Sequence, residues 1–155
     1  GEKELFHDTV AAVPLIVRHP GASARRGVSE PELVELIDLL PTFLDAIGAE
    51  VPDHLLEGRS LVPLLLQGQP RRTPRELAVS EGDYAFRSFV REPLNQPADR
   101  CRMFMIRSER WKYIHYEGLP PQLFDLLDDP QELVDRGRDP GLASVRDEHF
   151  AALFD

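Results

Sequence analysis

Three side chains that could do chemistry lie close together near the start of the sequence: Lys3, His7 and Asp8. An ammonium group suits a tetrahedral oxyanion, and a local positive pocket can bind an anion even on an acidic protein. We expect Asp8 to hold its loop by hydrogen bonds rather than to transfer a proton. His7 is a candidate for the rim of a substrate pocket, although a loop histidine more often has no role in a site.

Thiol and metal chemistry find little support elsewhere in the sequence. Cys101 is the only cysteine, so the chain has no internal disulfide and no cysteine-based zinc site. A group of carboxylates after residue 124 lacks the alternating ligands and central glycine of an EF-hand calcium loop. We expect these carboxylates to shape a turn and cap a helix: Asp125, Asp128, Asp129 and Glu132. We therefore predict no metal ligand in this chain.

Composition narrows the choice of partners. The formal net charge is −9 at pH 7, which argues against nucleic acid as a partner because phosphate backbones need clustered Lys and Arg. No apolar run is long enough to cross a membrane, so we expect no membrane association. A lone thiol suits a reducing compartment, which favours the cytoplasm without establishing it.

The elements that would position these groups fall into two parts. In residues 1–70, the unbroken apolar run from Val13 to Val17 predicts a strand buried on both faces, as in a parallel sheet. A helical period follows, with Asp38 as its N-cap and Gly48 beyond its C-cap. A short apolar helix then ends near Leu66. The Pro- and Arg-rich stretch from Gln69 to Arg75 predicts a linker.

The sequence of residues 76–155 predicts a small β-sheet. One strand is predicted at Leu77 to Ser80, and a hairpin is predicted from Met103 to Arg107 and Trp111 to Tyr116. A further short strand runs from Leu123 to Leu126. Asp139-Pro140 can start a last helix. The predicted fold is therefore α/β: a late strand and helix of a large mixed sheet, then a small antiparallel sheet covered by a C-terminal helix.

Taken in order along the chain, these features resemble the sulfatase family of the alkaline-phosphatase superfamily. The resemblance spans nearly the whole chain, and its motifs are Lys3, Val13 to Val17, Asp38 to Thr42, Gly58 to Leu61, Lys112-Tyr113, and Leu123 to Leu126 with Asp129-Pro130 and Glu132. The loop sequences look most similar to those of phosphonate monoester hydrolases and related arylsulfatases. The similar loops are at Ser80 to Arg87, at Cys101 and at Gly118 to Pro121.

The resemblance implies the C-terminal part of an alkaline-phosphatase-like sulfatase fold, from an enzyme that hydrolyses sulfate esters or phosphonate and phosphate monoesters. Such enzymes use a formylglycine, made from a cysteine or serine, beside a divalent cation (Ca, Mn or Mg). Cys101 cannot be that nucleophile, because Met103 and Met105 stand where the Cys/Ser-x-Pro-x-Arg motif requires proline and arginine. Lys3 matches a family active-site residue, and its ammonium would contact an oxygen of the bound sulfate or phosphonate.

In this family the nucleophile and the metal-binding residues precede the segment that corresponds to this chain. We therefore expect the chain to be part of a longer protein, called the parent enzyme below, and to be inactive alone. Its partners would be a small-molecule sulfate or phosphonate ester and the N-terminal half of the same enzyme. Relatives often assemble through C-terminal segments, so a homo-oligomer is compatible with the sequence.

Two alternatives stay open at this point. One is a non-catalytic interaction or scaffold module derived from the sulfatase fold. The other keeps the superfamily but changes the reaction to phosphodiester hydrolysis or phosphoryl transfer, because Lys3 suits any tetrahedral oxyanion.

Overall fold

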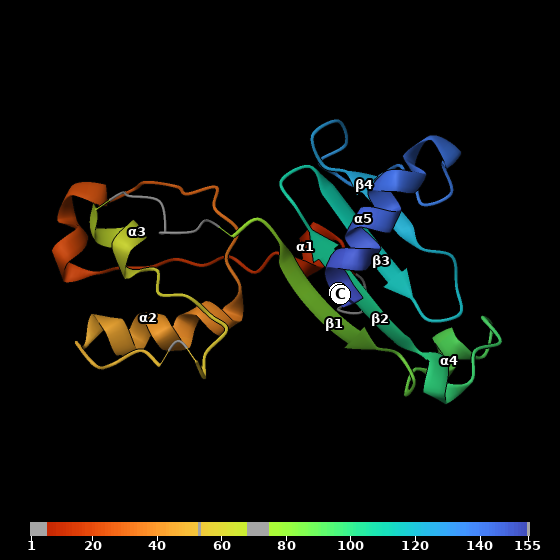
Figure 1. Cartoon of the computed structure of the whole chain (residues 1–155), viewed down its shortest axis with the longest axis horizontal. Coiled ribbons are helices and arrows are strands. Elements are labelled where there is room, and N and C mark those ends of the chain that lie inside the picture. Colours follow the sequence, from red (N-terminus) through yellow and green to blue (C-terminus); the bar gives the residue numbers. More distant parts are fainter. Residues whose placement is uncertain (1–5, 53, 68–74, 155) are drawn as a thin grey trace. The chain divides into compact units, whose positions relative to one another are not determined.

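The structure is a computed structural model that describes residues 6–52, 54–67 and 75–154. Its contacts divide the chain into two compact units (Figure 1). The first unit combines the segment that ends at Pro14 with the chain from Val79 onward, and the second runs from Leu15 to Ala78. The predicted boundaries of 1–70 and 76–155 stay a prediction for the parent enzyme. Within this chain, the segment that ends at Pro14 belongs with the C-terminal residues.

The first unit is built on a four-stranded sheet with the strand order β1-β2-β3-β4. The strands are β1 (Ala78–Asp83), β2 (Arg102–Arg107), β3 (Trp111–Tyr116) and β4 (Gln122–Asp125). β3 pairs antiparallel with both neighbours, with Met105 opposite Ile114 and Lys112 opposite Phe124. Ser108 closes the β2–β3 hairpin, because its Oγ accepts a hydrogen bond from the Trp111 amide at 3.0 Å. The predicted small antiparallel sheet is confirmed.

One face of this sheet is covered by helix α5 (Ala143–Phe154), which crosses β2 and β3 (Figure 1). The short 3-10 turn η4 (Pro140–Leu142) leads into α5, and the Asp139 side chain accepts a hydrogen bond from the Gly141 amide at 2.9 Å. His115 packs against Phe150 and Phe154, with ring centroids 5.2 and 5.4 Å apart. Burial lowers the pKa of His115, because the charged imidazolium is disfavoured away from water. This histidine therefore serves packing, as its strand face predicts.

The opposite face carries the main hydrophobic core, which includes Met103, Met105, Ile114 and Phe124. Because side chains alternate along a strand, these residues share their face with Lys112. Phe6 packs into the same core and leads into the short helix α1 (Asp8–Ala11). The β1–β2 connection holds α4 (Ser88–Arg91) and η3 (Ala98–Arg100).

The second unit contains η1 (Pro20–Arg25), η2 (Leu36–Asp38), α2 (Leu39–Ala46) and α3 (Val62–Gln67). Asp38 is its polar centre: the fully buried carboxylate accepts hydrogen bonds from the amides of Glu35 and Arg59, at 3.0 and 2.8 Å. It also accepts from the Arg75 guanidinium at 2.7 Å. Gly48 follows α2 with a φ of 72°, as a glycine beyond a C-cap should. The predicted bounds of this helix are confirmed, since α2 begins after Asp38 and ends before Gly48, but the Asp38 side chain makes no capping hydrogen bond to α2. No helix in the described part of the chain is long and apolar enough to cross a membrane.

The prediction of a buried strand from Val13 to Val17 is wrong for this chain. These residues have no regular secondary structure, and Ile16 is 93% exposed. An extended apolar run becomes a buried strand only when neighbouring strands supply its hydrogen bonds and cover its faces. The described sheet consists of β1 to β4, which pair with one another and not with residues 13–17.

A tight backbone approach at Gly58 gives a stability prediction. A Cβ added at Gly58 would lie 2.0 Å from the Ile37 carbonyl oxygen, which belongs to the backbone and cannot rotate away. We expect Gly58→Ala to destabilise the chain by about 1–3 kcal/mol or more, as measured by urea unfolding. Gly48→Ala is the matched control: its Cβ meets nothing within 4 Å, so only the cost of a positive φ remains, about 1 kcal/mol. An equal effect of both substitutions would contradict the clash.

Candidate functional site

The most unusual group in the first unit is a fully buried lysine. Lys112 lies near the start of β3, and its side chain is 0% exposed on the core face of the sheet. Its Nζ donates a hydrogen bond to the Phe6 carbonyl oxygen at 2.9 Å. It also makes ion pairs with the carboxylates of Asp8 and Glu132. Two carboxylates and one carbonyl oxygen therefore surround the buried ammonium and offset the loss of its hydration.

Glu132 completes the same arrangement from the turn that follows β4. Its side chain is 2% exposed, and its Oε2 accepts a hydrogen bond from the Asp8 amide at 2.8 Å. The same oxygen lies 3.1 Å from Nδ1 of His7. Glu132 has a φ of 57°, a backbone conformation that is uncommon for a residue with a side chain. The surrounding contacts therefore hold Glu132 in a conformation that it would otherwise avoid.

We call five residues the buried ion cluster after its two buried members, Lys112 and Glu132; the others, His7, Asp8 and Arg107, are partly exposed. Arg107 adds a second cation, with its Nη2 3.6 Å from Oδ2 of Asp8. Two fixed cations then face two carboxylates, so the charges balance. Such a paired set is a poor base or nucleophile, because each group is already engaged. What the cluster does is fasten residues 6–8 to the C-terminal sheet.

The structure describes one of the two predicted site residues. Lys3 lies outside the described residues. His7 immediately precedes α1, where its ring packs against Phe124 with centroids 5.4 Å apart and its Nδ1 meets Glu132. A substrate-binding role for His7 stays a prediction. Asp8 makes the hydrogen bonds and ion pairs expected of a residue that holds its loop.

The meeting of Lys112 and Glu132 was not predicted from the sequence. A usable signal was present: Lys112 shares its strand face with Ile114 and Tyr116, and a lysine on an apolar face needs a buried counter-charge. The partner could not be named from the sequence, since Glu132 follows β4 and Asp8 lies 104 residues before Lys112.

Cys101 is a packed core residue. It is fully buried, and its Sγ donates a hydrogen bond to the Pro97 carbonyl oxygen at 3.2 Å. Burial raises the pKa of the Cys101 thiol, and the negative charge of Asp83 raises it further. A buried thiol with a raised pKa holds little of the nucleophilic thiolate. This geometry agrees with the expectation that Cys101 is not the nucleophile.

The described residues do not fit the cofactors of a sulfatase-type site. No group of three or more His, Cys, Asp or Glu within them is arranged to hold a metal ion. The two carboxylates of the buried ion cluster are already neutralised by Lys112 and Arg107, which would repel a divalent cation. Cys101 gives no access for conversion to formylglycine.

The acidic residues shape the turn after β4, as expected, but they cap no helix, because the chain has none between β4 and η4. Asp125 accepts hydrogen bonds from Nε and Nη2 of Arg110, at 3.1 and 2.7 Å. Asp129 accepts from the Val134 amide at 2.8 Å. The hydrogen bond from Arg110 is the main cause of a lowered pKa of Asp125.

This pKa shift predicts an acid dependence of stability. A carboxyl whose pKa is lower in the folded chain stabilises it above the unfolded pKa of about 4. That contribution is lost as the pH falls through the lower folded pKa. We expect the melting temperature of Asp125→Asn to fall less steeply than that of the wild type between pH 5 and pH 2. Parallel pH profiles of the two proteins would contradict this assignment.

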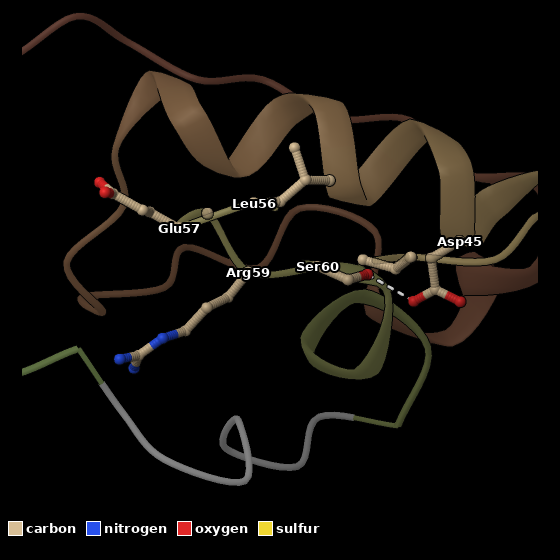
Figure 2. A pocket seen from close by; sticks show the side chains of 7 residues that line it. Asp45, Leu56, Glu57, Arg59 and Ser60 are labelled. Atoms are coloured by element: carbon tan, nitrogen blue, oxygen red, sulfur yellow. Dashed lines mark hydrogen bonds between the residues drawn. The ribbon is translucent and has the colours of Figure 1, made fainter. Parts of the chain in front are cut away.

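The second unit has an open depression of about 680 Å³ beside α2. It is lined by Asp45, Val51, Leu56, Glu57, Gly58, Arg59 and Ser60 (Figure 2). The Ser60 hydroxyl donates to Asp45 at 2.5 Å and accepts from the Val62 amide at 3.1 Å. Ser60 therefore ties the start of α3 to α2.

Comparison with known proteins supplies the family. The family model described as "N-sulphoglucosamine sulphohydrolase, C-terminal" matches residues 2–154. Multifunctional alkaline phosphatase superfamily protein PehA of Trinickia caryophylli is 36% identical over 91% of this chain and 28% of its own length. Arylsulfatase K of Gallus gallus is 38% identical over 85% of this chain and 23% of its own length.

A solved structure, the phosphonate monoester hydrolase of Agrobacterium radiobacter, matches with a TM-score of 0.70 and 35% identity. The match covers 87% of this chain and 26% of that enzyme, so the chain spans about a quarter of the length of these relatives. Both the sequence motifs and the fold thus agree with the expected resemblance. The chain belongs to the sulfatase family of the alkaline-phosphatase superfamily and corresponds to that family's C-terminal part.

Proposed function

We propose that this chain is the C-terminal portion of a metal-dependent hydrolase of sulfate esters or phosphonate and phosphate monoesters. The divalent cation and the formylglycine would be held by the rest of the parent enzyme. The observation that carries the proposal is the anchoring of Phe6 and Asp8 by the buried ion cluster. A lysine that must meet a substrate oxygen needs a fixed backbone nearby, and Lys3 lies three positions before Phe6 in the sequence.

In this proposal Lys3 acts on the negative charge of the substrate. Its ammonium would contact an oxygen of the bound sulfate or phosphonate and offset the charge that builds on the leaving oxygen. A fixed cation is worth more in a pocket with little water than at a surface, because the effective dielectric constant is lower there.

Exposed apolar residues support the N-terminal half of the same enzyme as a partner. Ile47, the residue that follows α2, is 79% exposed, and Phe43 on α2 and Leu36 on η2 are also exposed. Residues 36, 43 and 47 follow helical spacing and form an outward apolar stripe. Contiguous apolar surface of this kind marks an interaction site, and the exposed run that contains Ile16 needs a covering sheet in the same way.

The proposal is tested by comparing the 155-residue chain with the parent enzyme. We expect the chain alone to show no turnover of 4-nitrophenyl sulfate or of a 4-nitrophenyl phosphonate ester. The parent enzyme should hydrolyse at least one of them and lose that activity on chelation. Turnover that co-purifies with the chain alone, and that survives both chelation and Lys3→Ala, would contradict the proposal.

The second candidate is a scaffold module. It is favoured by one observation: both faces of the sheet are covered within this chain, one by helix α5 and the other by the core into which Phe6 packs. If the chain is an independent module, it should be monomeric and unfold cooperatively. If it is part of an enzyme, it should aggregate or recover its fold when the N-terminal half is added in trans.

A further inference from the structure

We propose that the turn after β4 is a docking surface for the N-terminal half of the parent enzyme. We call it the apolar turn, and it runs from residue 127 to residue 134 (Figure 1). Its apolar side chains would enter an apolar pocket of that half, with Lys or Arg at the rim of the pocket. This inference rests on the proposed function, because it needs a parent enzyme that contains an N-terminal half.

The apolar turn leaves three large apolar side chains in solvent. Leu127 is 62% exposed, Leu133 is 76% exposed and Val134 is 55% exposed. Leu126, directly before them, is buried in the core. A single exposed leucine is ordinary, but three such side chains within one short turn indicate an interaction site.

The apolar turn is held in a fixed geometry by its own hydrogen bonds. The Asp129 amide donates to the Asp125 carbonyl oxygen at 2.7 Å, and the Glu132 amide donates to the Asp129 carbonyl oxygen at 3.0 Å. The Asp129 carboxylate accepts a hydrogen bond from the Val134 amide at 2.8 Å. Contact residues that are already fixed lose little freedom when a partner binds, so this geometry favours docking.

Glu132 determines which side chains of the apolar turn face outward. Its own side chain is 2% exposed and pairs with Lys112, whereas Leu133, the next residue, lies in solvent. Glu132 has a φ of 57°, and backbone conformations of this kind persist only where the surroundings hold them, often at functional positions. The buried ion pair therefore fixes the point from which Leu133 and Val134 extend.

The charge of the apolar turn argues against a second copy of the chain as the partner. Residues 127–135 contain four acidic residues and no basic one. Glu132 is paired inside the fold, which leaves the carboxylates of Asp128, Asp129 and Asp135. In a twofold contact the same carboxylates would meet one another, and like charges brought together weaken an interface. A different surface, apolar with a basic rim, fits better.

The position of the apolar turn favours the N-terminal half as that surface. Glu132 accepts a hydrogen bond from the Asp8 amide at 2.8 Å, so the apolar turn lies beside residues 6–8. In the proposed function, the nucleophile and the metal ligands come before these residues in the parent enzyme. The N-terminal half is thus joined to the first unit next to the apolar turn. A tethered partner has a high effective concentration, so docking needs no second molecule.

Alkylation of an introduced cysteine tests the inference. Leu133→Cys is made in the parent enzyme and in the 155-residue chain, and the rate of its reaction with N-ethylmaleimide is read by peptide mass spectrometry. We expect position 133 to react at least about 10-fold more slowly in the parent enzyme than in the chain. Cys101 is 0% exposed, so an unreactive Cys101 reports that the chain is folded. If the chain does not fold, the parent enzyme unfolded in urea gives the reference rate.

Ser144→Cys is the matched control, because it is a nearly isosteric change at an exposed position near the start of α5. Its rate should agree within about 2-fold between the parent enzyme and the chain. A cysteine at position 133 that reacts as fast in the folded parent enzyme as in the reference would overturn the inference. Equal slowing at position 144 would overturn it too, since the protection would then not be specific to the apolar turn.

Dilution identifies the occupant. Protection by the N-terminal half is intramolecular and should not change on dilution, whereas protection that disappears on dilution would identify a second copy and overturn the inference. Turnover of the 4-nitrophenyl substrates is measured on the same preparation. A parent enzyme without turnover in which position 133 is protected contradicts the proposed function alone. An active parent enzyme in which position 133 is reactive overturns this inference alone.

Discussion

Lys112→Met is expected to lower the free energy of unfolding by about 3–5 kcal/mol. Methionine fills nearly the same space, but it leaves the Glu132 carboxylate, which is almost fully buried, without its cation. It also leaves the Phe6 carbonyl oxygen without its lysine donor. Because a domain of this size is stable by only about 5–15 kcal/mol, the loss should be evident in urea unfolding of the full chain.

Two companion variants identify the cause. Adding Glu132→Gln to Lys112→Met removes the uncompensated charge, so we expect part of the stability to return. Arg107→Gln tests a partly exposed pair, with 3.6 Å between Arg107 and Asp8, and should cost less than about 1 kcal/mol. A Lys112→Met protein as stable as Arg107→Gln would show that the buried ion cluster is not needed for the fold.

Lys3→Ala in the parent enzyme is the second large effect. If Lys3 stabilises the charge that develops in the transition state, its removal should lower kcat by about 10²–10³. KM should change less, because the interaction is stronger in the transition state than in the bound substrate. Steady-state kinetics with the 4-nitrophenyl substrates measure both constants.

Lys3→Arg serves as the control for charge. A guanidinium keeps the positive charge but replaces a compact ammonium by a planar fork, so the variant should recover only part of the lost rate. A Lys3→Ala enzyme with a kcat within about 2-fold of the wild type would remove Lys3 from the site, whatever the effect on KM.

Much of the small sheet could be predicted from the sequence because its signals are local. Alternation from Trp111 to Tyr116, a short polar turn at Ser108, and Asp139-Pro140 each specify an element within a few residues. The structure places the hairpin and the start of the last helix where these signals predict them. The helix from Asp38 to Gly48 could be bounded for the same reason.

What the sequence could not supply depends on distant partners. The run from Val13 to Val17 has the composition of a buried strand, but composition does not create the neighbouring strands it needs. The buried ion cluster joins residues more than 100 positions apart. Periodicity can reveal that Lys112 is on an apolar face, yet it cannot say which carboxylates will neutralise it.

The sequence separation within the buried ion cluster has a consequence for biosynthesis. His7 and Glu132 are 125 positions apart, so residues 6–8 leave the ribosome long before Glu132 has been made. At about 5–20 residues per second the wait is about 6–25 s. During that time the Asp8 amide and the Phe6 carbonyl remain hydrated by water. The anchor of the proposed catalytic lysine is therefore among the last contacts to form, and nascent chains stalled before Glu132 should leave this segment open to proteases.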